Sequence, residues 1–565
     1  GGLVAGAGGR IADASGRLRL FRGFNVVAKL PPFLPRRDAF DPAFSLVAED
    51  IATLESLGSN AVRLLVSWPG VEPARGSYND TYLDELEAIV NDLGAAGVHT
   101  LLDFHQDVYS PFFCGNGFPD WATHVAGYKP LPNASEDQYG AAPFPKPVRG
   151  QALPRDAHTG YVPHKACAAT APFPEYYLAE ATGVAFQALY DNVGGIRASL
   201  GAFWARVAAR FAGNPHVLGY DLINEPWSGD IYRKPVKLEG SKVDREVLLP
   251  LYDELSAAIR AHDNDSLIFF EPAVITSAIP LRRLAEEVGF DRPPKSSEGK
   301  AVLSYHTYCP LGGIVGEIAG EMVCSEFFDN VFGNHLPTAM ETAGVPAFLT
   351  EFGAVVTGEG FDAWTLNEVA RRADDLFLSA TYWAFKELGD PTTQSEDKQG
   401  VPHEGIWNTT TGELDAGKAT LLARTYAAAV AGKDITLHTY DPQTKEFALV
   451  YTHTKELATE ATPTEIRWST YVCPDGVSAH AVPSAATRVD AKSIPGTVLV
   501  WLNASEDTQV MVTVRRREGG ERGRAPGVAD RRGGASAADG GRRLDPPWSA
   551  LDRPGSSGVR DLAAV

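Results

Sequence analysis

The sequence predicts an α/β protein in which a (β/α)8 barrel, or TIM barrel, precedes a small antiparallel β-sandwich. Eight short runs rich in β-branched and aromatic residues alternate with amphipathic helical segments, and the pattern then changes to short strands separated by turns. The eight runs span residues 18–27, 60–67, 98–104, 217–224, 266–272, 301–307, 345–352 and 378–385. Eight is the strand number of a closed parallel barrel.

Segments between these runs carry apolar residues at helical spacing, as expected for the outer layer of a barrel. The clearest of them span residues 44–57, 82–96, 203–211, 247–261 and 361–376. From about residue 435 the pattern indicates the strands of the sandwich, at residues 446–453, 465–469, 496–502 and 508–514. We therefore expect a barrel over residues 1–430, a sandwich over 431–514 and a disordered low-complexity tail over 515–565.

The composition excludes several classes of protein. Of the 565 residues, 44 % are hydrophobic and 22 % are charged, so the chain can bury a large core. The formal net charge of -20 argues against a nucleic acid as partner, because a polyanion gains nothing from neutralising phosphates. No run approaches the roughly 18–20 consecutive apolar residues of a membrane span. We expect a soluble protein that is at most associated with a surface.

The five cysteines show no spacing suited to zinc, so we expect no metal centre. Cys114 with Cys167 and Cys309 with Cys324 each bracket one predicted loop segment, which favours two disulfides in an oxidising compartment. Free buried thiols are the alternative. Asn-x-Ser/Thr sequons suit a secreted or lumenal protein, although chance also supplies some of them. They lie at Asn79, Asn133, Asn264, Asn408 and Asn503.

One connection is far longer than an ordinary loop. Residues 110–200 follow the third predicted strand and are rich in Pro, Gly, Asn and aromatic residues. Long connections in compact domains are usually functional lids or disordered segments. Because the loops after the strands form the active face of such barrels, we expect this connection to face a substrate.

Two glutamates lie at the carboxyl ends of predicted strands, where a barrel carries its chemistry: Glu225 in Asn-Glu-Pro and Glu351 in Thr-Glu-Phe-Gly. Retaining glycosidases need two carboxyl groups about 5–5.5 Å apart, one as nucleophile and one as acid/base. We expect Glu351 to attack the anomeric carbon and Glu225 to protonate the leaving oxygen. Solvated or ion-paired glutamates are the alternative for either residue alone.

Three polar residues beside these glutamates are candidates for supporting roles. Asn224 precedes Glu225 and is expected to bond the sugar 2-hydroxyl, with a turn cap as the alternative. His306 and Tyr308 end the sixth predicted strand, where they are expected to orient the two carboxylates. A histidine at a strand end is also often purely structural.

Arg63 and Trp383 stand out in otherwise apolar strands. A buried guanidinium needs a carboxylate partner, so we expect Arg63 to face Glu351 and keep it ionised. A purely structural ion pair is the alternative. Trp383 offers a flat apolar face for stacking on a sugar ring, with core packing as the alternative.

With these residues the chain resembles glycoside hydrolase family 5, and more narrowly its endoglycoceramidase branch. Asn-Glu-Pro and Thr-Glu-Phe-Gly are typical of the wider family. The narrower likeness rests on five motifs, Arg-Gly-Phe-Asn-Val-Val-Ala-Lys-Leu-Pro-Pro (22–32), Val-Ser-Trp-Pro-Gly-Val-Glu-Pro (66–73), Asp-Phe-His-Gln-Asp-Val-Tyr-Ser (103–110), Gly-Asn-Gly-Phe-Pro-Asp-Trp-Ala (115–122) and Pro-Thr-Glu-Ile (463–466). Residues 128–177 match no pattern of that branch.

The resemblance implies hydrolysis, without a cofactor, of the β-glycosidic bond between a glycan and ceramide. It implies that Lys29, His105 and Asp107 hold hydroxyls of the first sugar. It also implies a glycosphingolipid substrate and transient contact with a membrane surface or micelle. Removal of a single sugar by a glucosylceramidase or steryl β-glucosidase is the alternative, followed by a β-glucanase or an inactive glycan-binding or lipid-binding protein.

An apolar channel for the aglycone is also implied. Aromatic and apolar residues that suit its lining could instead cover the end of the barrel. They are Leu30 to Pro35, Phe112, Phe113, Phe118 and Trp121.

Overall fold

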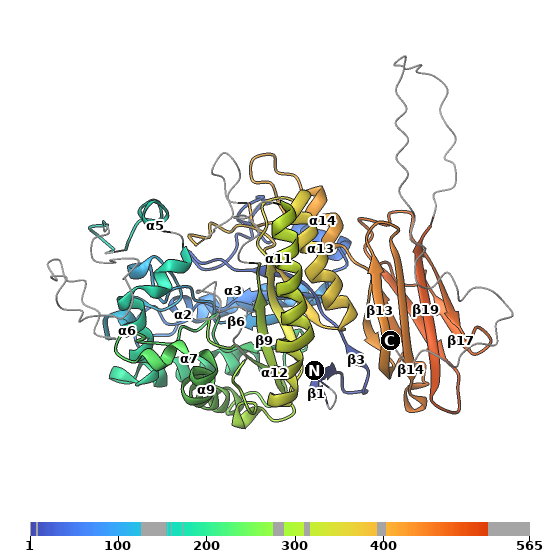
Figure 1. The fold of residues 1–565 in the computed structure, drawn as a ribbon, viewed down its shortest axis with the longest axis horizontal. Coiled ribbons are helices and arrows are strands. Elements are labelled where there is room, and N and C mark those ends of the chain that lie inside the picture. Colours follow the sequence, from blue (N-terminus) through green and yellow to red (C-terminus); the bar gives the residue numbers. More distant parts are fainter. Residues whose placement is uncertain are drawn as a thin grey trace, which may run out of the picture. The chain divides into compact units, whose positions relative to one another are not determined.

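The computed structural model describes residues 2–6, 9–125, 154, 156–159, 161–171, 173–274, 288–309, 317–392 and 403–517. Within these residues, eight strands close into a barrel in which every neighbouring pair is parallel (Figure 1). Each predicted run contains one barrel strand. The strands are β4 (Arg22–Val26), β5 (Ala61–Leu65), β6 (His99–Asp103), β7 (Val217–Asp221), β8 (Leu267–Phe270), β9 (Ala301–Thr307), β10 (Ala347–Gly353) and β11 (Ser379–Trp383).

Helices lie around the barrel strands (Figure 1). The long helix α3 illustrates how the sequence sets them: the Asn79 side chain caps its first turn by accepting from the backbone N–H of Tyr82, and its apolar residues recur on one buried face. The helices are α1 (Ala48–Ser56), α2 (Trp68–Val71), α3 (Asp80–Ala95), α4 (Asp120–Val125), α5 (His164–Thr170), α6 (Glu180–Tyr190), α7 (Ile196–Phe211), α8 (Gly240–Val243), α9 (Leu249–Arg260), α11 (Glu317–Asn330), α12 (Leu336–Ala343), α13 (Gly360–Asp375) and α14 (Ala416–Leu422).

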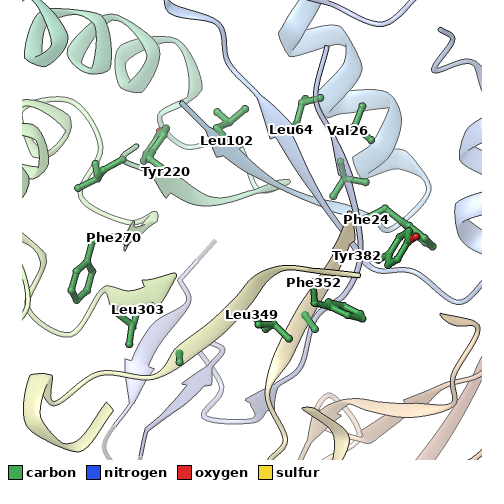
Figure 2. Packing of buried hydrophobic residues seen from close by; sticks show 14 of the residues in the cluster. Phe24, Val26, Leu64, Leu102, Tyr220, Phe270, Leu303, Leu349, Phe352 and Tyr382 are labelled. Carbon is green, nitrogen blue, oxygen red and sulfur yellow. The ribbon is translucent and has the colours of Figure 1, made fainter. Parts of the chain in front are cut away.

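Side chains alternate between the two faces of each barrel strand. The outer set packs against the helices as the main core (Figure 2), and includes Phe24, Val26, Leu64, Leu102, Tyr220, Phe270, Leu303 and Leu349. The inner set fills the barrel. Near the amino ends of the strands the inner side chains are apolar, and they include Phe21, Ala61, Leu101, Phe269, Val302 and Phe348. At the carboxyl end of the strands it becomes polar, and this polar layer carries the candidate site.

The C-terminal domain consists of two antiparallel sheets. One has the order β13 (Gly432–Asp441), β14 (Glu446–His453), β19 (Thr508–Arg516) and β16 (Val477–Val482). The other has the order β1 (Val4–Gly6), β2 (Arg10–Ala12), β3 (Leu18–Arg19), β12 (Tyr426–Val430), β15 (Thr464–Arg467), β18 (Thr497–Leu502) and β17 (Thr487–Asp490).

These strands correct the domain boundaries expected from the sequence. The N-terminal strands β1 to β3 and strand β12 belong to the C-terminal sheet, so the barrel does not span residues 1–430. The run 18–27 contains two strands, β3 and β4, which belong to different sheets. Its apolar residues continue across the junction without a turn residue, so the sequence pattern predicts a single strand there. Strand β19 continues to Arg516, past the expected end at 514, and residues 518–565 of the expected tail lie outside the described part.

A buried ionic cluster joins the barrel to the C-terminal domain. The Asp374 carboxylate, near the end of α13, pairs with Arg22 at 2.9 Å and with Arg424 at 2.6 Å. His438 of β13 contacts the Asp374 carbonyl through Nδ1 at 2.9 Å, and its Nε2 accepts from the Ala427 N–H at 3.1 Å.

Both favoured cysteine pairs form disulfides. Cys114 is joined to Cys167 with 5.8 Å between the Cα atoms, and Cys309 to Cys324 with 5.6 Å. Cys473 is a buried free thiol. None of the helices in the described ranges has the length and apolar character needed to cross a membrane.

Candidate active site

The two predicted glutamates converge at the carboxyl end of the barrel. Glu225 follows β7, and Glu351 lies within β10. One carboxylate oxygen of Glu225 and one of Glu351 lie within 4.8 Å of each other. Glu225 adopts a left-handed backbone conformation with φ 41°, which is uncommon for a non-glycine residue and is typical of functional sites. The separation suits direct attack on a sugar carbon held between the two groups, and leaves too little room for the interposed water of an inverting enzyme.

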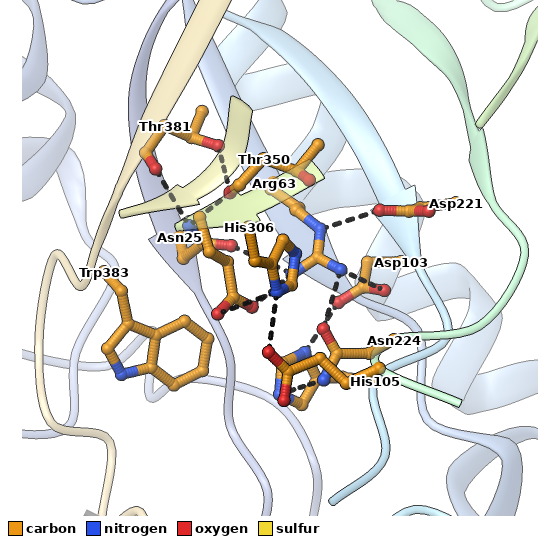
Figure 3. Close-up of polar contacts among 12 residues, drawn as sticks. Asn25, Arg63, Asp103, His105, Asp221, Asn224, His306, Thr350, Thr381 and Trp383 are labelled. Carbon is orange, nitrogen blue, oxygen red and sulfur yellow. Dashed lines mark hydrogen bonds and ion pairs between the residues drawn. The ribbon is translucent and has the colours of Figure 1, made fainter. Parts of the chain in front are cut away.

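His306, from β9, bridges the two carboxylates (Figure 3). Its Nδ1 lies 2.9 Å from Glu225 Oε1 and 3.5 Å from Glu351 Oε2, and its Nε2 lies 2.9 Å from Glu271 Oε1. Burial opposes a charged imidazole, but Glu271 and Glu351 outweigh burial and raise the pKa of His306 well above its usual value. The surrounding acidic groups therefore favour the imidazolium form of His306.

Arg63, from β5, is fully buried and contacts four acidic side chains, of which Asp103 and Asp221 are labelled in Figure 3. Its guanidinium lies 2.7 Å from Glu351, 2.9 Å from Asp221, 3.0 Å from Asp103 and 3.3 Å from Glu271. Burial, with the charges of Glu271 and Asp103, raises the pKa of Asp221 to about 8 against the opposing charge of Arg63. The structure thus places Arg63 against Glu351, as expected, but within a larger network.

Glu351 receives hydrogen bonds on both oxygens. The Tyr308 hydroxyl donates to Oε2 at 2.8 Å, and Arg63 donates to Oε1 at 2.7 Å. Burial raises the pKa of Glu351 above its usual value, although the charges of His306 and Arg63 oppose the shift. The donors hold the carboxylate in one orientation, as a nucleophile requires.

Asn224 is fixed from two sides beside Glu225. Its side-chain oxygen accepts from Arg63 at 3.0 Å, and its Nδ2 donates to the Gln106 carbonyl at 3.0 Å. The Gln106 side chain donates in turn to the carbonyls of Asn224 and Glu225, at 2.7 and 2.9 Å. This contact set orders the segment that carries the acid.

Lys29, His105, Asp107 and Trp383 form a second group in the mouth of the barrel. Lys29 Nζ lies 2.7 Å from Asp107 and 4.7 Å from the centre of the Trp383 ring, and His105 stacks on Trp383 at 5.2 Å. Burial disfavours the charged form, but Asp107 and Asp103 raise the pKa of His105 to about 9. These charged donors around an indole suit a sugar ring, which offers hydroxyls at its edge and C–H groups on its faces.

Several members of this site were not predicted from the sequence. Lys29 also contacts Asp390 and Thr392, at 2.7 Å each, and Glu404 accepts from the Trp383 indole N–H at 2.8 Å. No periodic pattern singles out these loop residues. A usable signal existed for Asp103, Asp221 and Glu271, because alternation along each strand places them on the inner face with Arg63.

The expected aglycone lining is corrected in part. Phe112, Phe113 and Phe118 are at most 3 % exposed and pack in the core, where Phe118 stacks on Tyr109 at 3.7 Å. They therefore pack in the buried core and do not line an open channel, which agrees with the alternative that they cover the end of the barrel. Trp121 packs edge-on against a neighbouring indole and donates to the Glu72 carbonyl.

The apolar surface that does adjoin the site is smaller. Trp383 clusters with Val27, Leu65 and Ala384, and three partly buried residues pack against this cluster. They are Phe33, Tyr308 and Ala354. Of the proposed stretch from Leu30 to Pro35, only Phe33 belongs to it, while Leu30 is exposed.

Comparison with known proteins agrees with this geometry. The profile of the cellulase family, glycosyl hydrolase family 5, matches residues 40–389, and the profile of the glycoside hydrolase family 5 C-terminal domain matches residues 424–514. An endoglycoceramidase of Hydra vulgaris is 34 % identical over 444 residues, which cover 78 % of this chain and 76 % of that protein. Endoglycoceramidase I of Rhodococcus hoagii is 29 % identical over 517 residues, covering 90 % and 87 %.

A solved structure shares the fold. Endo-glycoceramidase II from Rhodococcus sp., in its ganglioside GM3 complex, superposes with a TM-score of 0.67 at 24 % identity, covering 90 % of this chain and 99 % of that chain. Both family profiles and the barrel with its C-terminal sheets lead to the same assignment. This chain belongs to glycoside hydrolase family 5.

Proposed function

We propose that this protein is a retaining β-glycosidase that releases intact glycans from glycosphingolipids, as an endoglycoceramidase does. The observation that supports the mechanism is the pair Glu225 and Glu351, whose carboxylate oxygens lie within 4.8 Å and share one imidazole nitrogen. The endoglycoceramidases that resemble the chain over most of its length support the substrate class.

The first step forms a glycosyl-enzyme. The Glu351 carboxylate attacks the anomeric carbon, the bond from this carbon to the aglycone oxygen breaks, and Glu225 gives its proton to that oxygen. Arg63 and Tyr308 hold Glu351 in line for the attack. The Asn224 amide, ordered by Gln106, is positioned to bond the sugar 2-hydroxyl as positive charge develops on the ring.

The second step releases the sugar. Glu225, now a carboxylate, removes a proton from a water that attacks the anomeric carbon, and Glu351 leaves as the free carboxylate. His306 contacts Glu225 at 2.9 Å, so its charge stabilises the carboxylate between the two steps. Two inversions at one carbon return the β configuration.

The mouth of the barrel also supports transient contact with a lipid surface. Leu30 and Phe44 are 46 % and 45 % exposed, and both lie within 3.5 Å of the position that a Cβ at Gly389 would occupy. Lys29 precedes Leu30 in the chain and Asp390 follows Gly389, and these two charged residues contact each other at 2.7 Å within the site. A change of Leu30 and Phe44 to Glu should therefore weaken co-sedimentation with phosphatidylcholine vesicles, and unchanged co-sedimentation would count against this contact.

Secretion or a lumenal location is part of the proposal. Two disulfides form, and Asn79, Asn264 and Asn503 are exposed at their sequons. Asn408 is half-buried, and Asn133 lies outside the described residues. Expression in a glycosylating host should give a product whose mobility changes on enzymatic deglycosylation, and a reduced, unglycosylated product would contradict this location.

The decisive experiment offers the enzyme fluorescent lactosylceramide and glucosylceramide. We expect release of intact lactose together with ceramide, because the proposed bond is the one between glycan and lipid. Sequential release of galactose and then glucose would instead assign a single-sugar β-glucosidase. Hydrolysis of cellulose oligomers without release of ceramide would assign a β-glucanase.

A further inference from the structure

Glu271 lies at the centre of the site, although it is neither the proposed acid nor the proposed nucleophile. It follows β8 and is 2 % exposed. Its Oε2 accepts from the Glu225 backbone N–H at 2.6 Å. Its Oε1 lies 2.9 Å from His306 Nε2, 3.1 Å from the Ser304 hydroxyl and 3.3 Å from Arg63. One carboxylate therefore reaches both the acid's backbone and the imidazole that contacts the acid's side chain.

We propose that Glu271 is a positioning residue that keeps His306 doubly protonated and fixes the backbone of Glu225, so that Glu225 remains an effective acid. This inference rests on the proposed function, because it gives Glu225 the role of acid. Glu271 contacts neither the sugar nor the aglycone in this scheme. Its effect passes through His306 and through the main chain.

The charge around His306 supports the first part of the proposal. The acidic groups that face its ring are Glu225 after β7, Glu271 after β8 and Glu351 in β10, and Asp221 interacts with it from β7. Glu271 Oε1 lies 2.9 Å from Nε2 as an ionic contact, whereas Glu225 and Glu351 lie closest to Nδ1. Burial works against ionisation of Glu271, yet His306 lowers the pKa of Glu271, so both members of the pair stay charged.

The backbone of Glu225 supports the second part. A positive φ is unfavourable for a glutamate and persists only where the surroundings enforce it. Two side chains form hydrogen bonds with the backbone of this residue: Glu271 accepts from its N–H, and Gln106 donates to its carbonyl at 2.9 Å. Loss of the first contact leaves a strained residue held from one side only.

The chemical consequence concerns proton transfer from Glu225 to the leaving oxygen. When Glu225 gives up its proton, the charged His306 stabilises the carboxylate that remains. A neutral His306 gives no such stabilisation, so proton transfer to a poor leaving group becomes slower. An activated aryl leaving group needs little protonation and should be almost insensitive.

The test replaces Glu271 with Gln, which keeps an oxygen for the Glu225 N–H but removes the charge. The kcat/KM of variant and parent is measured from about pH 5.5 to pH 8 on an alkyl β-glycoside and on a dinitrophenyl β-glycoside. On the alkyl glycoside, we expect the ratio of variant to parent to fall about 10-fold or more across this range, as His306 titrates near its usual value of about 6.5. On the dinitrophenyl glycoside the ratio should stay nearly constant.

Three controls isolate the charge. Glu271→Asp keeps the charge and should keep the pH profile of the parent, even if the rate falls. Glu368→Gln removes a carboxylate that pairs with Arg371 and Arg372 on α13, and should change neither profile. In a His306→Gln background, Glu271→Gln should add no pH dependence.

The outcomes separate the inference from the function on which it rests. A ratio that stays constant with pH on the alkyl glycoside, or a pH effect that also appears in Glu271→Asp, would overturn the positioning role. If Glu271→Gln does not fold, the Glu271→Asp profile and the ring nitrogen shifts of His306 in the parent still decide, because a neutral His306 at pH 7 contradicts the inference. A parent without activity on either β-glycoside would instead refute the proposed function.

Discussion

Two buried ionic clusters in this protein have opposite charge balance. At the mouth of the barrel, Arg63 and His306 face five carboxyl groups, those of Asp103, Asp221, Glu225, Glu271 and Glu351. At the contact with the C-terminal domain, Arg22 and Arg424 share the single carboxylate of Asp374.

Each cluster contains a histidine, and the pKa values of the two histidines shift in opposite directions. Carboxylates raise the pKa of His306 well above its usual value despite its burial. Burial lowers the pKa of His438 to about 4, aided by the charge of Arg22 and opposed by Asp374. Burial disfavours both imidazolium ions, so the charges that surround each ring decide which of them forms.

The difference in charge balance indicates which cluster serves catalysis at a cost in stability. The mouth crowds like charges around one guanidinium, which burial makes costly. The domain contact carries one excess positive charge, and neutral His438 satisfies both ring nitrogens, donating to the Asp374 carbonyl and accepting from Ala427. The first cluster is therefore expected to control activity, and the second to control stability.

The largest effect should come from Glu351→Gln. The change removes the nucleophile, so kcat/KM should fall about 1,000-fold or more, which corresponds to about 4 kcal/mol. It also removes one of the crowded charges, so the midpoint of thermal unfolding should stay the same or rise. Kinetics on an aryl β-glycoside and a melting curve measure both. Glu456→Gln, at an exposed position, is the matched control and should change neither.

Asp374→Asn should give the opposite pattern. It leaves Arg22 and Arg424 buried without their shared carboxylate, which should lower the free energy of unfolding by about 3 kcal/mol. The kcat/KM should stay within about 2-fold of the parent, because Asp374 lies outside the contact network of the glutamate pair. Denaturant unfolding and aryl glycoside kinetics provide the two readings. A large loss of activity in the folded variant would show that the two clusters are coupled.

The comparison also shows what the sequence could predict. The barrel was predictable because β-branched and aromatic runs alternate with segments of helical periodicity, and each expected run contains a barrel strand, of which β10 extends one residue further, to Gly353. The pair Glu225 and Glu351 was predictable because the ends of parallel strands meet. The family likeness was carried by local motifs in strand β4, in the segments that follow strands β5 and β6, and in strand β15 of the C-terminal domain.

Other features depend on contacts between distant segments. No local pattern shows that Leu18–Arg19 pairs with β12, more than 400 residues away, and that Arg22 then starts the barrel. The aromatic residues Phe112 and Phe118 suit a channel and a core equally well, and only their neighbours in space decide. The role of Glu271 is visible only once His306 and the Glu225 backbone lie against it.

The smallest expected effect concerns the pH dependence of stability. His438 has a folded pKa of about 4, below the usual 6.5, so the unfolded chain binds a proton that the folded chain excludes between these values. Its contribution to stability is therefore complete above about pH 6.5 and is lost as the pH falls towards 4. His306 has the opposite sign, because its pKa is raised: its contribution is present below about 6.5 and is lost only as the pH rises through the raised value.

His438→Gln isolates this contribution. Relative to the variant, the parent should lose about 1–2 kcal/mol of unfolding free energy between pH 7 and pH 5, because only the parent carries the titrating ring. Urea unfolding of both proteins at the two pH values gives the difference, which cancels every other titrating group. Any pH-independent destabilisation of the variant does not affect the result, because the comparison uses only the change in unfolding free energy between the two pH values. Equal slopes would mean that His438 is protonated in the folded protein, and that the Ala427 N–H faces a cation rather than a lone pair.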